Sequence, residues 1–362
     1  MDTLVILYRT IVISLLFALF FDILVNNYVC IISIVIVKIT YSYAEIKYKN
    51  LLPVKKKAVL ITGCDTGFGF HLANRLANDG FVVFAGVLSL TEDYAINGRD
   101  RKVSNVHAVQ LDVTKTEDIQ QAVLKVMNIS GGLWGIVNNA GIELSGDIEL
   151  CTLSLYRKVQ EINLYGYIAV IKAFLPMIRK SKGRIVNVSS ILGRQSWPGR
   201  SAYHISKHAI ETMSDSLRLE MVKFGVGVSI IEPGNYGHAT SIAAKVACER
   251  IKQDVGKMWD EALPEVRQFY GRDYFFRALK GYTECCSKFD PTLDTEKAVQ
   301  PVTEAIKDAL INTRPKARYI VDGGTGLFDI DAVYARIFNF LPEYITDFII
   351  GMKTGCYKAF NS

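Results

Sequence analysis

The sequence predicts an α/β fold in which a doubly wound parallel sheet of about seven strands follows an N-terminal membrane segment. Strand-like and helix-like stretches alternate from Ala58 to Val321, an order that produces right-handed βαβ units with helices on both faces of a sheet. A glycine-rich turn follows the first of these strands, between Gly63 and Gly69. Two apolar stretches at the start of the chain predict the membrane segment.

The first element along the chain is this membrane segment. Residues 3–25 and 28–44 are nearly continuous apolar runs. The first is long enough to span a bilayer, which takes about 20 apolar residues, and the second is marginal. A cleaved signal peptide is the competing interpretation, but Asp2 stands where a basic region is expected and no small-x-small site follows. A mitochondrial transit peptide is disfavoured because such peptides are rich in arginine and poor in acids.

A lysine cluster follows the apolar runs. Between Lys38 and Lys57 there are six lysines and one acid, which supply +5 of the chain's net charge of +6. The cluster is typical of a positive-inside flank or of contact with anionic lipid heads, with a solvated linker as the alternative. The remainder of the chain is nearly neutral, so no basic face suggests binding of nucleic acid.

The segment from 58 to 69 reads AVLITGCDTGFG and predicts a nucleotide site. Its glycines let the backbone turn tightly and approach a pyrophosphate, whose charge the free N–H groups of the following helix would bind. The glycine spacing is three then one, unlike the commonest dinucleotide fingerprint, and a simple turn is the alternative for such a cluster alone. The residues expected at the cofactor here are Gly63, Thr66, Gly67, Phe68 and Gly69.

Two later strand ends fall in the order expected for the same nucleotide site. Leu111-Asp112-Val113 ends one strand, where Asp112 could hold the adenine edge. The run WGIVNNAG, from 134 to 141, reads as a buried strand that ends in a small polar turn formed by Asn139, Ala140 and Gly141.

Ser190, Tyr203 and Lys207 form a catalytic signature near the middle of the chain. Tyr203 and Lys207 are four residues apart and share one face of a helix, and Ser190 ends an apolar run that predicts a neighbouring strand. Tyrosine has an ordinary pKa of about 10, which a nearby ammonium lowers. We therefore expect Tyr203 to be the acid/base, Lys207 to lower its pKa, and Ser190 to bind the reacting oxygen. Ser189 is the weaker candidate because it points to the opposite side of an extended strand.

Together these motifs resemble the short-chain dehydrogenase/reductase family. The resemblance covers roughly residues 55 to 240 and rests on TGxxxGxG, NNAG, the Asn163 segment, the Ser190 strand, YxxxK and Glu232-Pro233-Gly234. It implies a Rossmann-type fold and hydride transfer between a nicotinamide cofactor and a CH–OH carbon. By this resemblance Lys207 also holds the nicotinamide ribose and Asn163 supports a water relay. The resemblance further places at the cofactor Asn139, Ala140, Gly141, Tyr203, Lys207, Pro233 and Gly234.

The predicted organisation has three parts. Residues 1–50 form the membrane anchor and basic flank, and residues 51–325 form a Rossmann-type dehydrogenase domain with a substrate-loop insert at 235–291. Residues 326–362 form an apolar tail that either covers the pocket or rests on the bilayer. Aromatic and methionine side chains of the insert could line an apolar pocket, although most could equally be structural core: Met258, Trp259, Phe269, Tyr270, Tyr274, Phe275 and Phe276.

Within the family the chain resembles the branch of 17β-hydroxysteroid, retinol and mitochondrial 3-hydroxybutyrate dehydrogenases. We expect a membrane-anchored oxidoreductase of a lipophilic, steroid- or retinoid-like secondary alcohol or ketone, because a hydroxy acid needs a cation for its buried carboxylate. A 3-hydroxybutyrate dehydrogenase is one alternative, and an inactive membrane-bound scaffold is an alternative of another class.

NAD is favoured over NADP as the cofactor. Neither the glycine turn nor the run from Ala85 to Thr91 offers an arginine or lysine for a 2′-phosphate. The acidic residue usual for NAD is also missing from the strand end, where Val87 stands.

The seven cysteines are scattered, odd in number and without metal-ligand spacing, which predicts free thiols and no metal. The expected partners are a lipophilic small molecule and membrane lipid, with homo-oligomerisation left open. The expected location is the endoplasmic reticulum membrane with the catalytic domain facing the cytosol, and a mitochondrial membrane is the alternative.

Overall fold

The structure is a computed structural model that describes residues 36, 50–90, 105–237, 240, 245–273, 295–323 and 329–354. The chain divides into two units, Met1–Leu51 and Leu52–Ser362, and the fold described here is that of the second. Apart from Ile36, the predicted anchor at residues 3–44 lies outside the described residues.

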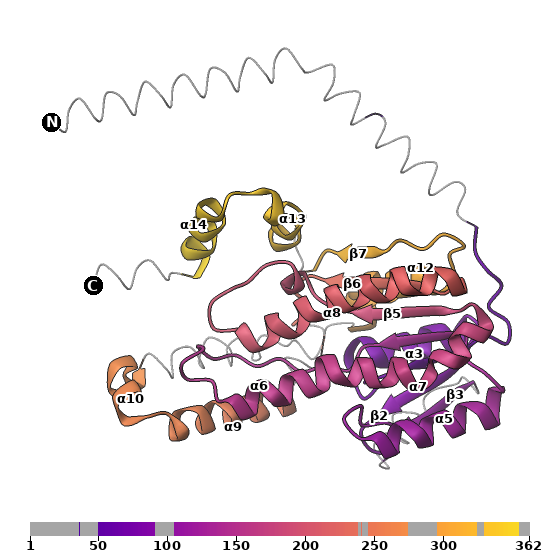
Figure 1. Cartoon of the computed structure of the whole chain (residues 1–362), viewed down its shortest axis with the longest axis horizontal. Coiled ribbons are helices and arrows are strands. Elements are labelled where there is room, and N and C mark those ends of the chain that lie inside the picture. Colours follow the sequence, from indigo (N-terminus) through magenta and orange to yellow (C-terminus); the bar gives the residue numbers. More distant parts are fainter. Residues whose placement is uncertain are drawn as a thin grey trace. The chain divides into compact units, whose positions relative to one another are not determined.

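A seven-stranded parallel sheet forms the centre of the fold, in the order β3-β2-β1-β4-β5-β6-β7 (Figure 1). The predicted doubly wound sheet is confirmed, and its last strand is the expected Arg318–Val321. The order reverses between β1 and β4, and ligands of such sheets bind at the carboxyl ends beside this point. The strands are β1 (Ala58–Ile61), β2 (Val82–Val87), β3 (Val106–Gln110), β4 (Gly135–Asn138), β5 (Arg184–Val188), β6 (Gly227–Pro233) and β7 (Arg318–Val321).

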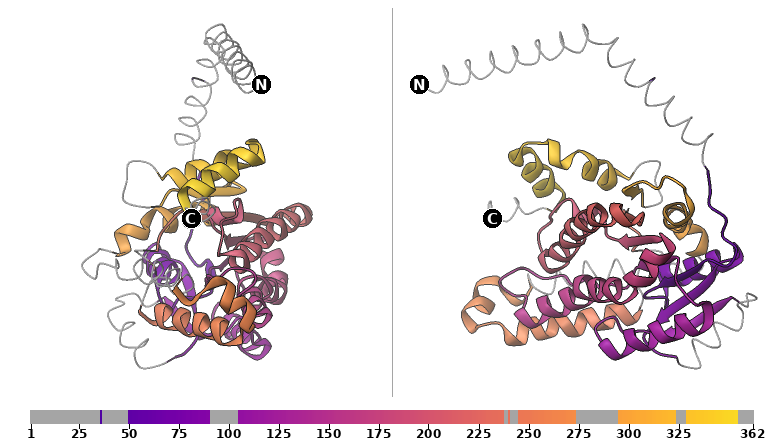
Figure 2. Two further views of the ribbon diagram at one scale, coloured as in Figure 1. Left: turned by 90° about the vertical axis from the view of Figure 1, so that its left-hand side faces the viewer. Right: turned by 45° about the vertical axis from the view of Figure 1, so that its right-hand side comes forward.

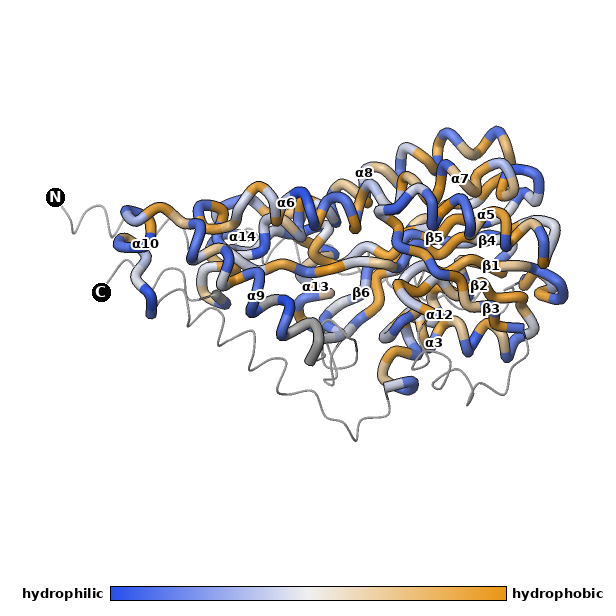
Figure 3. Tube along the Cα trace, turned by 90° about the horizontal axis from the view of Figure 1, so that it is seen from below, coloured by the Kyte–Doolittle hydropathy of each residue, from blue (hydrophilic) through white to orange (hydrophobic). Residues whose placement is uncertain are grey.

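Helices cover both faces of the sheet (Figure 2). α3 and α12 bury one hydrophobic cluster against it, and α5, α7 and α8 bury a second cluster on the opposite face. Figure 3 shows the strands as mostly hydrophobic and the helices as mixed, which is typical of parallel strands buried on both sides. The helices named so far are α3 (Gly67–Asn78), α5 (Thr116–Ser130), α7 (Gly166–Ser181), α8 (Ser201–Met221) and α12 (Thr295–Ile311).

One continuous helical run among the described residues, Leu153–Ser181, is long and apolar enough to cross a membrane by length and composition alone. It comprises α6 (Leu153–Gln160), the π-helical turn η1 (Glu161–Tyr165) and α7. Val170, Phe174 and Ile178 of this run are fully buried in the cluster against the sheet. The packing therefore identifies it as a core helix.

The remaining helices lie in the insert and in the C-terminal tail. α9 (Lys245–Glu261) and α10 (Pro264–Tyr270) belong to the insert between β6 and β7. α13 (Ile330–Ile337), the short turn η5 (Phe338–Phe340) and α14 (Glu343–Thr354) form the tail. Two further short turns are η2 (Ile191–Gly193) and η3 (Val222–Phe224). Ala332 and Ala335 of α13 pack on Ile191 of η2, which places the tail beside the end of β5.

Candidate active site

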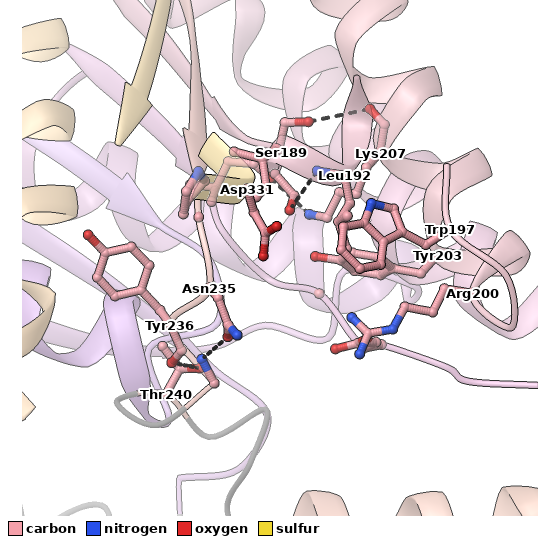
Figure 4. A pocket seen from close by; sticks show the side chains of 18 of the residues that line it. Ser189, Leu192, Trp197, Arg200, Tyr203, Lys207, Asn235, Tyr236, Thr240 and Asp331 are labelled. Atoms are coloured by element: carbon pink, nitrogen blue, oxygen red, sulfur yellow. Dashed lines mark hydrogen bonds and ion pairs between the residues drawn. The ribbon is translucent and has the colours of Figure 1, made fainter. Parts of the chain in front are cut away.

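A pocket of about 690 Å³ opens at the carboxyl ends of the central strands. Its wall includes Phe68 at the start of α3, Asn139 after β4, Ser189 after β5 and Gly234 after β6. Figure 4 shows Ser189, Tyr203 and Lys207 on this wall. The structure therefore brings together eight of the residues predicted from the sequence, namely Phe68, Asn139, Gly141, Ser190, Tyr203, Lys207, Pro233 and Gly234.

Ser190 and Tyr203 both line this pocket. Ser190 caps η2, where its hydroxyl accepts a hydrogen bond from the backbone N–H of Leu192 at 3.2 Å, and it is close enough to the Tyr203 phenol to oppose the rise of its pKa. Tyr203 lies in the first turn of α8, and Lys207 follows one turn later. The Lys207 ammonium donates to the carbonyl of Val188 at 3.0 Å and lies 5.5 Å from the centre of the Tyr203 ring.

Ser189, the weaker candidate, is turned away from the tyrosine. Its hydroxyl donates to the backbone carbonyl of Lys207 at 3.4 Å. Alternation along the extended chain thus leaves Ser190 as the serine that can share a substrate oxygen with Tyr203.

Burial controls the ionisation of both catalytic candidates. It raises the pKa of the Tyr203 phenol, with a further increase from Glu143, while the Ser190 hydrogen bond and Arg200 oppose the rise. Burial also lowers the pKa of Lys207 to about 8, against the nearby Glu211 and Glu143 carboxylates. Loss of hydration therefore outweighs the charges around the phenol in this geometry, and a lowering of the Tyr203 pKa by Lys207 stays a prediction.

The glycine turn and the NNAG turn lock together beside the pocket. A Cβ on Gly69 would lie 2.2 Å from the Gly63 carbonyl oxygen, and a Cβ on Gly63 would lie 2.8 Å from the Ala140 Cα. The Asn139 amide donates to the carbonyls of Thr62 and Gly63 at 2.9 and 3.0 Å. Only glycine permits this close packing, and at Gly63 also the φ of +68°.

These turns fit a dinucleotide. α3 begins at Gly67, and Gly69 lies in its first turn. The N-cap residue Thr66 makes no side-chain capping hydrogen bond. The first N–H groups of the helix are therefore available to a pyrophosphate. When bound, a nicotinamide dinucleotide would supply the hydride acceptor or donor.

Asp65, in the glycine turn, is a candidate cofactor residue that sequence reasoning missed. Its carboxylate accepts a hydrogen bond from the backbone N–H of Leu88 at 3.0 Å, directly after β2. A carboxylate at that strand end is the usual partner of the NAD ribose, and here it comes from the preceding loop and not from the strand. No local spacing signals this contact, because Asp65 and Leu88 meet only through the pairing of β1 with β2.

Asp112 is not brought into the pocket. Its carboxylate accepts hydrogen bonds from the backbone N–H and the hydroxyl of Thr114, at 3.0 and 2.7 Å, and lies 3.6 Å from the Lys115 ammonium. These contacts form a local turn after β3, so a contact with adenine stays a prediction.

The comparison with known proteins agrees with these motifs. The family model described as short chain dehydrogenase matches residues 57–249. The mitochondrial D-beta-hydroxybutyrate dehydrogenase of Bos taurus is 44% identical over 74% of this chain and 77% of its own. The chain belongs to the short-chain dehydrogenase family. It is an NAD(P)-dependent oxidoreductase that acts on CH–OH groups.

Other relatives and solved structures belong to the same family. Retinol dehydrogenase 7 of Rattus norvegicus is 38% identical over 82% of this chain and 88% of its own. A short-chain dehydrogenase from Streptomyces avermitilis has a TM-score of 0.58 at 23% identity, over 83% of this chain and 99% of its own. A Burkholderia phymatum member solved with NAD has a TM-score of 0.58 at 22% identity, over 71% of this chain and 88% of its own. At these identities the structures support the fold alone.

Asn163 of this short-chain dehydrogenase lies behind the pocket, in the π-helical turn η1. Its side chain bridges the N–H and the carbonyl of Ile142, both at 2.9 Å, and donates to the Ser206 hydroxyl at 3.0 Å. These bonds tie the loop after β4 to α8, and π-helical turns often occur at functional sites. The water relay expected from Asn163 stays a prediction.

Among the insert residues that the sequence suggested for a pocket wall, the four that the structure describes do not line the pocket. Met258, Trp259 and Tyr270 pack in a separate cluster with α6, and Phe269 is exposed. Tyr274, Phe275 and Phe276 lie outside the described residues. Met258 belongs to that cluster because α9 packs on the loop after β4, where the Met258 sulfur lies against Gly146. The described insert residues in the pocket wall are instead Asn235, Tyr236, Gly237 and Thr240.

The rest of the wall comes from the segment before α8 and from the tail. Ile191, Leu192, Trp197 and Pro198 provide apolar surface. Arg200 pairs with Glu143 at 3.0 Å, and Lys353 of α14 pairs with Asp331 of α13. Lys353 also lies 5.2 Å from the centre of the Trp197 ring. The described part of the tail therefore contributes Asp331 and Lys353 to the pocket wall, and its contact with a bilayer stays a prediction.

Proposed function

We propose that this short-chain dehydrogenase is membrane-anchored and uses NAD to interconvert a lipophilic secondary alcohol and its ketone. The observation that carries the proposal is that Ser190, Tyr203 and Lys207 line one pocket beside a dinucleotide-compatible turn. Tyr203 removes the hydroxyl proton in oxidation and returns it in reduction, while Ser190 holds the same oxygen. Lys207 places its ammonium 5.5 Å from the centre of the Tyr203 ring and provides a contact for the nicotinamide ribose.

Buried charge supports an uncharged substrate. Arg200 is the pocket cation best placed for a carboxylate, but Glu143 already pairs with it. Glu143 is buried and close enough to Tyr203 to raise its pKa, so a substrate carboxylate at Arg200 would be buried beside a second carboxylate. That repulsion disfavours a hydroxy acid, whereas an apolar substrate gains about 25 cal/mol for each Å² of surface that it buries against the apolar wall.

NAD is the proposed cofactor because the carboxylate of Asp65 lies at the end of β2. It would accept a hydrogen bond from the ribose 2′-hydroxyl of NAD and repel the 2′-phosphate of NADP.

A 3-hydroxybutyrate dehydrogenase is the second candidate. It is favoured by the presence of Arg200 in the pocket wall and by the 44% identity to the bovine D-beta-hydroxybutyrate dehydrogenase. In that case the substrate carboxylate would share Arg200 with Glu143 or displace it.

The two candidates are distinguished by specificity constants. We would compare kcat/KM for estradiol, testosterone, retinol and (R)-3-hydroxybutyrate with NAD, in detergent and with added phospholipid. A preference for a steroid or for retinol supports the lipophilic substrate, and a preference for hydroxybutyrate in both conditions overturns it. Turnover of none, with NADH binding retained, would favour the inactive scaffold.

The membrane anchor remains a proposal that rests on the apolar runs and the lysine cluster of the first 57 residues. Exposed apolar side chains of the tail offer a further surface for lipid, namely Val333, Ile337, Phe340, Tyr344, Phe348 and Met352. The proposed location is the endoplasmic reticulum membrane, with the mitochondrial membrane as the alternative. Carbonate extraction tests the anchor, and release of the uncleaved chain into the soluble fraction would contradict it.

A further inference from the structure

Gln195 is a fully buried polar residue with no hydrogen-bonding partner. Its side chain has no exposed surface, and neither its amide nitrogen nor its amide oxygen makes a hydrogen bond. It nevertheless forms part of the pocket wall, between η2 and Trp197. Buried side-chain amides are normally bonded, so an amide with both atoms unpaired beside a pocket points to a partner, and because the amide has no accessible surface a substrate oxygen reaches it only when the wall around it shifts.

The backbone on each side of Gln195 is held in place. Arg194 donates to the Glu232 carboxylate at 2.8 Å, and the backbone N–H of Trp197 donates to the imidazole of His204 at 3.3 Å. These contacts anchor the segment that carries Gln195 to β6 and α8. The ring nitrogen of Trp197 is a second buried donor in the same wall without a partner.

Gln195 is a separate residue of this lining from the catalytic candidates Ser190 and Tyr203. Gln195 is uncharged, so its matching group is a neutral one that donates or accepts, such as a carbonyl or a hydroxyl. A substrate that supplies this group relieves an unsatisfied buried amide, whereas one that lacks it leaves the amide unpaired.

We propose that Gln195 is a specificity-determining residue that hydrogen-bonds a second, neutral oxygen of the substrate, remote from the reacting hydroxyl. The inference rests on the proposed function in taking the substrate to be a lipophilic alcohol. It narrows that class to alcohols with a further carbonyl or hydroxyl, and it predicts poor turnover of otherwise identical alcohols without one.

Thermal stability provides a test that needs no substrate. Gln195→Met keeps the length of the side chain and removes the unpaired amide, so the Tm of the full-length protein should rise by a few degrees. The matched control is Gln160→Met, because the Gln160 amide nitrogen donates to the Ala202 carbonyl at 2.9 Å and its loss should lower the Tm. A lower Tm in Gln195→Met, comparable with the control, would show that the amide has a structural partner and would overturn the proposal.

Substrate pairs test the recognition itself. Androstanol has one oxygen, the reacting hydroxyl, and dihydrotestosterone adds a ketone at the far end. We expect the wild type to favour dihydrotestosterone by roughly tenfold in kcat/KM, through KM, and Gln195→Met to abolish this preference while leaving kcat nearly unchanged. Leu192→Met, which reshapes the same wall without a polar change, should affect both steroids alike.

The outcomes separate this proposal from the proposed function. If the wild type turns over both steroids and Gln195→Met changes them in equal proportion, the role of Gln195 is wrong although the substrate class is right. If the wild type turns over neither, the lipophilic substrate class is wrong, and the Tm comparison still decides whether the Gln195 amide is unpaired.

Discussion

Replacing Glu143 by glutamine should raise kcat/KM for hydroxy acids. Glu143 lies 3.0 Å from Arg200, with its side chain 10% exposed and that of Arg200 42% exposed. At an effective dielectric constant of about 20, two unit charges at this distance attract by roughly 5 kcal/mol, which exposure of the guanidinium reduces. A charge-assisted hydrogen bond nets about 1.5–3 kcal/mol, so a substrate carboxylate that replaces Glu143 should gain roughly tenfold to a hundredfold in kcat/KM.

The assay compares kcat/KM for (R)-3-hydroxybutyrate and for the best lipophilic alcohol in wild type and in Glu143→Gln. Glutamine keeps the shape of the side chain, so the lipophilic alcohol should change by less than about threefold. A second signature is independent of the substrate carboxylate. Because the Glu143 charge raises the pKa of Tyr203, its removal should lower that pKa and move the pH profile of alcohol oxidation to lower pH.

The double variant Glu143→Gln/Arg200→Gln is the control. It should lose the increase in kcat/KM for hydroxybutyrate, and its pH profile of alcohol oxidation should still lie at lower pH than that of the wild type. The reasoning is refuted if the wild type oxidises hydroxybutyrate efficiently and Glu143→Gln reduces that activity. Such a result would mean that Glu143 assists Arg200 in binding the acid.

Three further changes test separate parts of the site. Tyr203→Phe should reduce single-turnover oxidation by at least roughly a hundredfold and leave NADH binding nearly intact, because the ring still packs; substantial remaining oxidation would identify another acid/base. Asp65→Asn should reduce the preference for NAD over NADP several-fold in kcat/KM, and an unchanged ratio would place the ribose elsewhere. Burial and Glu232 raise the pKa of the Glu211 carboxyl. The folded protein therefore keeps a proton on Glu211 that the unfolded chain releases. Because of this, the free energy of unfolding falls as pH rises toward that pKa. The loss amounts to at most about 1.4 kcal/mol per pH unit, and Glu211→Gln should reduce it. Urea unfolding at pH values of about 5 to 8 measures it in both proteins. If the free energy of unfolding of the wild type and of the variant depended on pH in the same way, the pKa shift would be contradicted.

The sheet was predictable because each parallel strand carries its own signal. A strand buried on both faces is apolar throughout, as β1 is, and the stretches between strands have helical character. The end of the sheet at Arg318–Val321 follows from the same pattern. The catalytic grouping was predictable because Tyr203 and Lys207 are one helical turn apart and Ser190 follows closely after the adjacent strand β5.

Contacts between segments far apart in the chain were not predictable. Glu143 and Arg200 meet because the loop after β4 lies beside the start of α8, and Asp331 and Lys353 reach the pocket through the tail helices. The aromatic content of the insert indicated a pocket wall, but packing against α6 placed its described members in a separate cluster.

The sequence by itself determined the parallel sheet, the glycine turn, and the serine, tyrosine and lysine of the site, because spacing within one element dictates which side chains share a face. Only the tertiary structure decided the ionisation of those groups, since burial of Tyr203 and Lys207 depends on everything packed around them. It also decided which polar side chains reach the pocket and which of them, such as Gln195, stay unpaired there. Those properties depend on the distances between elements, which spacing along the chain does not encode.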